Sequence, residues 1–128
     1  MVERIFDTFG RLDILVNNAA FQMSRETIEE ISTEEFDRVF KTNVYAMFWL
    51  CRAALGRMEA GSVIINTASI QAYDPSAHLL AYAATKAAII NFTKALSQMA
   101  MKRSVRVNAV APGPVWTPLI PATMAGPP

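Results

Sequence analysis

With 128 residues and a net charge of +1, the chain is long enough for one domain with a hydrophobic core and too short for a two-domain enzyme. Apolar residues make up 52% of the chain and charged residues 18%, which excludes intrinsic disorder and gives no basic surface for nucleic acid or an anionic membrane. The single cysteine, Cys51, excludes an internal disulfide and a cysteine metal cluster, and the longest apolar run, 44–55, is too short to span a bilayer. We therefore expect a cytoplasmic protein that binds no metal, nucleic acid or membrane.

The first 20 residues predict a short helix followed by a strand. Apolar residues within 2–9 fall on one helical face, and Gly10 follows them as a C-cap. Residues 12–16 then form a short apolar run that ends in Asn17-Asn18-Ala19-Ala20. In an open parallel sheet, the carboxyl ends of the strands are where ligands bind, so these small and amide-bearing residues are candidates for a binding site.

A long amphipathic helix is predicted after Ser32, which has the spacing of a capping box with Glu35. Its apolar stripe runs from Phe36 to Met58 at helical spacing. Asn43 lies on this stripe, four residues from an apolar residue on either side, so its amide should point inward. Either the backbone satisfies this amide in the core, or the amide orders a water molecule near a site.

Two further strands and one helix complete an alternating pattern. Residues 62–67 predict a second buried strand that leads to Ser69, and a helix rich in alanine extends from about residue 79 to 102. A third strand over 104–109 stops at Pro112-Gly113-Pro114. Strands that alternate with helices predict an α/β fold with right-handed crossovers and a parallel sheet.

Tyr82 and Lys86 stand four residues apart near the start of the alanine-rich helix, so their side chains project from the same face. An adjacent ammonium favours a phenolate, so we expect the pKa of Tyr82 to lie below its ordinary value of about 10. Taken alone, the spacing also fits a surface lysine beside a half-buried tyrosine. With Ser69 one loop earlier, however, a hydroxyl and a phenol can converge on one substrate oxygen while a cofactor carries hydride.

Five motifs, in this order, resemble those of the short-chain dehydrogenase/reductase family. They are Asn17-Asn18-Ala19-Ala20, Asn43, Ser69, the pair Tyr82 and Lys86, and the run from Pro112 to Pro118. The resemblance extends through essentially the whole chain. The motifs at the strand ends favour dehydrogenases over the sugar-nucleotide epimerases and dehydratases that share the tyrosine and lysine pair, and enoyl reductases of the superfamily space that pair further apart.

The resemblance implies an NAD(P)-dependent oxidoreductase that interconverts a secondary alcohol and a ketone. It implies that Tyr82 is the general acid/base, that Ser69 binds the substrate oxygen, and that Asn43 holds a water of the proton relay. Lys86 is implied to lower the pKa of the tyrosine and to bind the nicotinamide ribose. The implied cofactor-binding residues are Asn17, Asn18, Ala19, Tyr82, Lys86, Pro112, Gly113, Val115 and Thr117, the cofactor is NAD or NADP, and no metal is implied.

Four residues near this site are our prediction for the wall of the substrate site: Gln71, Tyr73, His78 and Trp116. Two of them have other interpretations, because His78 also fits a solvated or capping residue and Trp116 also fits a side chain packed under a lid. None of the four identifies the small-molecule alcohol or ketone.

The chain departs from the family pattern near its ends. The family begins with a glycine-rich βαβ unit that receives the pyrophosphate. Here the five glycines are Gly10, Gly56, Gly61, Gly113 and Gly126, and no two lie within four positions of each other. The closing strand is missing as well, and residues 121–128 have the composition of a linker. We expect residues 1–128 to form a single, truncated Rossmann-type domain with three parallel strands, long flanking helices and an exposed sheet face.

A second interpretation is that the chain is an inactive assembly module. The resemblance implies that the two long helices form a contact between subunits, and their apolar faces suit such packing. We therefore expect a homo-oligomer that associates through these helices.

Overall fold

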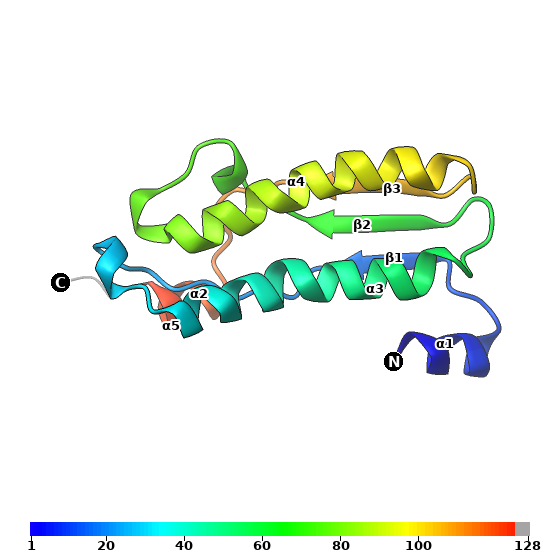
Figure 1. Cartoon of the computed structure of the whole chain (residues 1–128), viewed down its shortest axis with the longest axis horizontal. Coiled ribbons are helices and arrows are strands. Elements are labelled where there is room, and N and C mark those ends of the chain that lie inside the picture. Colours follow the sequence, from blue (N-terminus) through cyan, green and yellow to red (C-terminus); the bar gives the residue numbers. More distant parts are fainter. Residues whose placement is uncertain (125–128) are drawn as a thin grey trace.

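The computed structural model describes residues 1–124 and shows a three-stranded parallel sheet with long helices (Figure 1). The helices and strands are α1 (Val2–Phe9), β1 (Ile14–Asn17), α2 (Thr33–Phe40), α3 (Ala46–Leu55), β2 (Val63–Thr67), α4 (Leu80–Met101), β3 (Arg106–Val110) and α5 (Leu119–Thr123). The order confirms the predicted partial Rossmann-like fold. The observed strands begin or end one or two residues away from the predicted boundaries, because hydrogen bonds define the observed ends and composition defined the predicted ones.

The three strands lie in the order β1-β2-β3, and every neighbouring pair is parallel. In the register, Leu15 is opposite Ile64 and Ile64 is opposite Val107, so one apolar row crosses the sheet. Helix α3 packs against β1, and α4 packs against β2 and β3. The core between these layers is closely filled, because Ile64 and Ala54 have no exposed surface.

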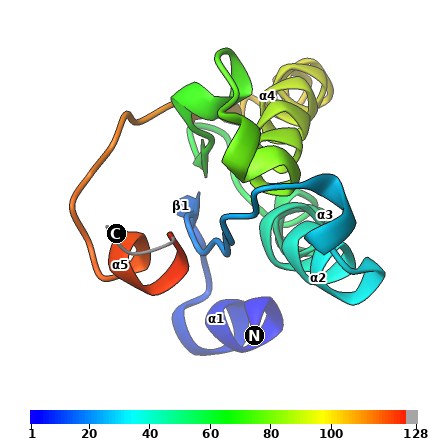
Figure 2. The same cartoon turned by 90° about the vertical axis from the view of Figure 1, so that its left-hand side faces the viewer.

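The opposite face of β1 is open over the described residues. Side chains alternate along a strand, so Ile14 and Val16 point away from α3, and they are 61% and 54% exposed. This agrees with the expectation of an exposed sheet face. Figure 2 shows the sheet end-on, with α5 on the other side of β1 from α2 and α3.

The predicted long helix is continuous but not uniform. Its N-cap Ser32 accepts a hydrogen bond from the backbone nitrogen of Glu35 at 3.1 Å. The predicted capping box is only half formed, because the Glu35 carboxylate binds the Arg25 guanidinium. Between α2 and α3, residues Lys41–Tyr45 form a turn of π-helix that contains Asn43. Such turns are frequent at functional sites, since the extra residue changes the direction in which side chains project.

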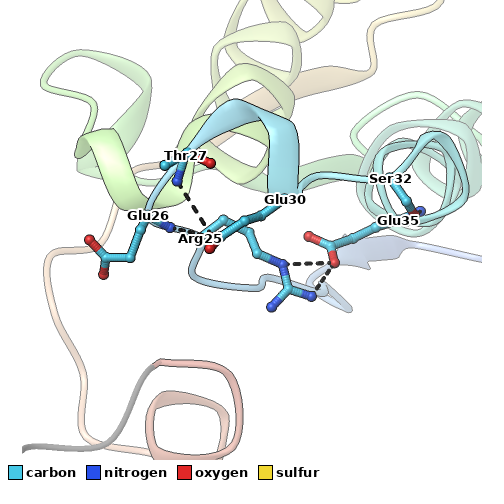
Figure 3. Close-up of polar contacts among 6 residues, drawn as sticks. All are labelled: Arg25, Glu26, Thr27, Glu30, Ser32 and Glu35. Carbon is cyan, nitrogen blue, oxygen red and sulfur yellow. Dashed lines mark hydrogen bonds and ion pairs between the residues drawn. The ribbon is translucent and has the colours of Figure 1, made fainter.

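The segment that follows β1 is anchored to α2 and to the turn that precedes α4. Figure 3 shows Arg25 reaching Glu35, with its Nε donating to the carboxylate at 3.1 Å. In the same segment, the carboxylate of Glu30 accepts a hydrogen bond from the backbone nitrogen of Glu26 at 2.8 Å. The backbone nitrogen of Arg25 donates to the carbonyl of His78 at 3.0 Å, which fixes the segment beside the start of α4.

The end of the described chain corrects one expectation. Residues from Pro121 onward were expected to be a linker, but Leu119–Thr123 form the short helix α5. The remaining part of the predicted linker, 125–128, lies outside the described residues. Within residues 1–124, no helix combines the length and the hydropathy that a membrane crossing requires.

Candidate active site

A cavity of about 450 Å³ lies at the carboxyl edge of the sheet, between the start of α4, the loop after β3 and α5. This is the edge at which we expect ligands, because the carboxyl ends of the parallel strands meet there. Of the predicted site residues, the cavity is lined by Asn18, Ser69, Gln71, Tyr82, Lys86, Pro112, Gly113, Val115 and Thr117. The structure therefore brings together residues that lie up to 99 positions apart in the sequence.

Ser69 is held in place by backbone hydrogen bonds on both of its sides. The nitrogen of Ala68 donates to the carbonyl of Val110 at 2.8 Å, and the nitrogen of Ile70 donates to the carbonyl of Pro112 at 3.1 Å. These bonds extend the pairing of β2 with β3 past the ends of both strands. Ser69 is 8% exposed and lines the cavity, so its hydroxyl has a fixed position at the sheet edge.

Tyr82 lies in the first turn of α4 and is partly buried. Burial raises the pKa of its phenol above the ordinary value, and a hydrogen bond of the Ser69 side chain opposes part of this increase. The expected decrease of this pKa is therefore wrong for this structure, because desolvation of the phenolate outweighs the stabilising contacts. The phenol is protonated at neutral pH, which is the form that can donate to a carbonyl oxygen.

Lys86 is almost fully enclosed, with 2% of its surface exposed. Its Nζ donates to the backbone carbonyl of Thr67 at 2.7 Å and lies 5.2 Å from the centre of the Tyr82 ring. The predicted proximity of the two side chains is thus present. Burial lowers the pKa of the lysine from 10.5 to about 8, because a backbone carbonyl compensates less for lost hydration than a carboxylate does.

Asn43 is 3% exposed and uses its amide within the protein. Its Oδ1 accepts from the nitrogen of Phe21 at 2.7 Å, and its Nδ2 donates to the carbonyl of Phe21 at 2.9 Å and to Oγ1 of Thr85 at 3.0 Å. Thr85 donates in turn to the carbonyl of Tyr82 at 2.6 Å. Of the two interpretations of Asn43, the one in which its amide is hydrogen-bonded to the backbone in the interior is confirmed. A water held near Asn43 stays a prediction.

Asn17 belongs to a buried polar chain between the sheet and the helices. Its Nδ2 donates to Oδ1 of Asn66 at 2.8 Å and contacts Sγ of Cys51 at 3.4 Å, and Asn66 donates to Oγ1 of Thr93 at 3.0 Å. Among residues 1–124, Oδ1 of Asn17 is buried with no hydrogen-bond partner. Burial also raises the pKa of the Cys51 thiol to about 11. Asn17 lines a smaller cavity of about 80 Å³ together with Asn18 and Ala19.

Three of the four predicted wall residues are not among those that line the larger cavity. Tyr73 is 67% and Trp116 is 82% exposed, and neither lines it. His78 also lies outside the lining, and its Nδ1 is 3.5 Å from a carboxylate oxygen of Glu26. Gln71 does line the cavity, and its Oε1 accepts from the nitrogen of Ser76 at 2.6 Å.

Sequence reasoning missed two kinds of site residue. Thr85 lies four residues after Ala81 and four before Ile89 on the buried side of α4, which is the pattern that singled out Asn43. Gln22 lines the cavity and binds Thr123 across 101 positions of sequence, and no local pattern signals such a contact.

The donor set of the larger cavity is mainly neutral. Lys86 is the one charged side chain among its described lining residues, and hydroxyls, amides and backbone groups supply the other polar atoms. Such a set suits carboxamide and hydroxyl groups of a ligand. Within the described part of the chain, no three His, Cys, Asp or Glu side chains are grouped so that they could hold a metal ion.

Known proteins resemble this chain over nearly its whole length. Residues 1–126 match the sequence pattern of the family described as short chain dehydrogenase. A glucose and ribitol dehydrogenase of Daucus carota is 52% identical over 96% of this chain. The chloroplastic NADPH-dependent aldehyde reductase 1 of Arabidopsis thaliana is 51% identical over 96%.

Among solved structures, a 3-ketoacyl-(acyl-carrier-protein) reductase of Brucella melitensis, in complex with NADH, superimposes with a TM-score of 0.89 and 34% identity. The match covers 96% of this chain and 53% of that protein. The chain spans 42% of the carrot protein and 43% of the Arabidopsis protein, so it corresponds to less than half of these relatives.

Proposed function

The chain belongs to the short-chain dehydrogenase family, and on this basis we propose that it provides the catalytic part of an NAD(P)-dependent oxidoreductase that interconverts a secondary alcohol and a ketone. The observation that carries the proposal is the meeting of Ser69, Tyr82 and Lys86 in one cavity at the carboxyl edge of the sheet. We further propose that residues 1–128 act as a single Rossmann-type unit.

In ketone reduction, Tyr82 donates its phenolic proton to the carbonyl oxygen, and the Ser69 hydroxyl donates a second hydrogen bond to the same oxygen. The carbonyl carbon receives the hydride that a nicotinamide cofactor supplies, so the products are an alcohol and a tyrosinate. Lys86 has a pKa of about 8 and lies over the phenol ring, so it can hold and release a proton near neutral pH. Alcohol oxidation runs through the same groups in reverse.

The residues that would hold the cofactor are those at the strand ends. Backbone and hydroxyl groups of Pro112, Gly113, Val115 and Thr117 line the cavity and suit a carboxamide, and Lys86 suits the ribose hydroxyls. Asn18 and Ala19 would line the other end of the cofactor. The side-chain nitrogen of Asn17 already donates to Asn66 and its side-chain oxygen is buried, so we expect its backbone to face the cofactor.

The relatives support a nicotinamide cofactor and chemistry at an alcohol or carbonyl group. One is named as a dehydrogenase of glucose and ribitol, one as an NADPH-dependent aldehyde reductase, and one structure holds NADH. Both cofactor forms thus occur among proteins similar to this one, and the proposal covers NAD and NADP alike.

The decisive experiment measures nicotinamide oxidation with a panel of ketones and aldehydes, and compares Tyr82→Phe with the unchanged protein. Losing the proton donor should reduce turnover by about 10²- to 10⁴-fold. Tyr73→Phe is the matched control, because Tyr73 is exposed and lies outside the cavity. A Tyr82→Phe protein that turns over at the unchanged rate contradicts the proposal.

A second candidate function, assembly through the long helices, rests on a different observation. Tyr45, at the end of the π-helical turn, and Phe48 and Trp49 of α3 are 47%, 41% and 49% exposed. Phe48 also packs edge-on against Phe92 of α4, with ring centres 6.5 Å apart, so the aromatic surface joins both helices. We propose that this surface mediates a homo-oligomer, with or without catalysis.

A further inference from the structure

The larger cavity contains a buried amide that the proposed chemistry does not use. Gln22 follows the end of β1, is 3% exposed and lines the same cavity as Ser69 and Tyr82. A buried amide oxygen or nitrogen without a partner is costly, so a side chain held in this position needs contacts for both of its ends.

The partner of one end is known. Nε2 of Gln22 donates to Oγ1 of Thr123 at 2.9 Å, and Oγ1 of Thr123 donates its own proton to the carbonyl of Leu119 at 2.6 Å. Because a hydroxyl has one proton, Thr123 can only accept from Gln22. The nitrogen of the amide therefore faces Thr123, and the oxygen faces away from it.

The amide oxygen is left free for a ligand. Among residues 1–124, the hydrogen bond to Thr123 is the one that the Gln22 side chain makes, and Oε1 accepts none. Gln22 lines the larger cavity beside Ser69 and Tyr82, so its amide oxygen can meet a ligand there. The backbone nitrogen of Ser24 also donates to the carbonyl of Thr123 at 2.9 Å, so a second contact holds this segment against α5.

We propose that Gln22 is a specificity-determining residue whose Oε1 accepts a hydrogen bond from a second hydroxyl of the substrate, one that does not react. This inference rests on the proposed function, in which Ser69 and Tyr82 bind the reacting oxygen. The substrate class is then a neutral polyhydroxylated compound, such as a sugar or polyol, rather than a simple ketone.

The same geometry disfavours an anionic substrate. A carboxylate or phosphate group needs donors, but the cavity-facing atom of Gln22 is an acceptor and its nitrogen is already bound. Lys86, the one charged side chain of the described lining, uses one of its three donors on the carbonyl of Thr67, and the proposed function assigns the others to the ribose hydroxyls of the cofactor. A hydroxyl, by contrast, can donate to Oε1 without loss of either contact.

The test is a hydroxyl scan that compares D-glucose with its 2-deoxy, 3-deoxy and 6-deoxy analogues. For each sugar, kcat/KM is measured with nicotinamide cofactor, and binding is measured separately by ligand-observed NMR titration. At one position, removing the hydroxyl should lower kcat/KM and affinity of the unchanged protein by about tenfold, the value of one neutral hydrogen bond. Gln22→Met keeps the size of the side chain but lacks the amide. In this variant, the ratio of kcat/KM for glucose to kcat/KM for that analogue should fall to about one, and so should the ratio of their affinities.

Two further variants separate recognition from positioning. Gln22→Glu keeps an acceptor, so the ratio of kcat/KM should remain, whereas Thr123→Val removes the partner that orients the amide, so the ratio should fall. The proposal is overturned if Gln22→Met keeps the ratio, if all sugars lose equally, or, where Gln22→Met does not fold, if Gln22→Glu loses the ratio. If no carbonyl compound is turned over at all, the proposed function fails, and the NMR ratios alone decide the role of Gln22.

Discussion

Asn43 binds both polar groups of one residue's backbone: its Oδ1 accepts from Phe21 N at 2.7 Å, and its Nδ2 donates to Phe21 O at 2.9 Å. A side-chain amide in this arrangement provides the two hydrogen bonds that a neighbouring strand would otherwise provide. It thereby ties the segment that leaves β1 to the π-helical turn between α2 and α3.

We expect Asn43→Leu to lower the free energy of unfolding by about 2–4 kcal/mol, because leucine has a similar size but leaves the backbone groups of Phe21 buried without partners. Chemical denaturation measures the change. Asn91→Leu is the matched control, since Asn91 lies exposed on α4 and its substitution should change stability by less than about 0.5 kcal/mol. Equal effects at the two positions would show that the bonds to Phe21 contribute nothing.

Thr85→Val should cost about 1–2 kcal/mol, because Oγ1 of Thr85 accepts from Asn43 and donates to the carbonyl of Tyr82. Valine keeps the shape of the side chain, so the loss reports the hydrogen bonds. A double-mutant cycle with Asn43→Leu should give a coupling energy of about 0.5 kcal/mol or more, as the two residues share one bond. Strict additivity would contradict the described connection between Asn43 and Thr85.

The buried ammonium of Lys86 should make stability depend on pH. Burial lowers its pKa from 10.5 to about 8, so between these pH values the unfolded chain binds more protons than the folded one. The free energy of unfolding should therefore rise with pH across this window, by about 3 kcal/mol in total.

Lys86→Met should remove this rise in stability with pH. Subtracting the curve of the variant from that of the unchanged protein separates the contribution of Lys86 from those of other groups. One of these is Cys51, whose raised pKa makes stability fall as the pH rises. Lys94→Met, at an exposed position of α4, is the control and should leave the pH dependence intact. Parallel stability curves for Lys86→Met and the unchanged protein between pH 8 and 10.5 would exclude a buried ammonium.

Tyr82 should ionise above the ordinary tyrosine value of 10.0, because burial raises the pKa of its phenol. Ultraviolet difference spectroscopy follows tyrosinate formation as the pH rises, and Tyr82→Phe should remove a step with a pKa above 10.0. The sign for stability is opposite to that of Lys86: the folded state keeps its proton longer, so this contribution is lost as the pH rises past the ordinary value. If the substitution removes a step below 10, desolvation does not dominate at this residue.

Trp49→Glu should reduce self-association, because it places a charge in the exposed aromatic surface of α3 and α4. Sedimentation velocity over a range of concentrations measures the effect. Ile28→Glu is the control, since Ile28 is an exposed apolar residue, 63% accessible, in the short turn before α2. If an oligomer dissociates to the same extent in Trp49→Glu and Ile28→Glu, or in neither variant, assembly through this surface is contradicted. Turnover measured on the same samples distinguishes an active oligomer from an inactive module.

Local pattern was enough to predict the helices and strands and the proximity of Tyr82 and Lys86. Helix periodicity and the apolar runs depend on neighbouring residues alone, and a spacing of four places two side chains on one face. The same periodicity marked Asn43 as buried, and it applies equally to Thr85. The parallel sheet followed from the alternation of strands and helices, because right-handed crossovers leave few topologies.

Other properties depended on what packs around each group. The pKa of Tyr82 rises rather than falls because burial, which sequence spacing does not report, outweighs its contacts. Trp116, predicted near the substrate, is 82% exposed because nothing among residues 1–124 covers it. The contact between Gln22 and Thr123 joins positions 101 residues apart.

The sequence by itself thus determined the family, the parallel α/β architecture and the order of the residues around the candidate site, since these depend on periodicity and motif spacing. The tertiary structure decided the pKa shifts of Tyr82 and Lys86, the partners of Asn43, and, among residues 1–124, the direction in which the Gln22 amide points. Desolvation and hydrogen-bond direction are set by atoms brought together from distant parts of the chain, and these neighbours exist only once the sheet and helices have packed.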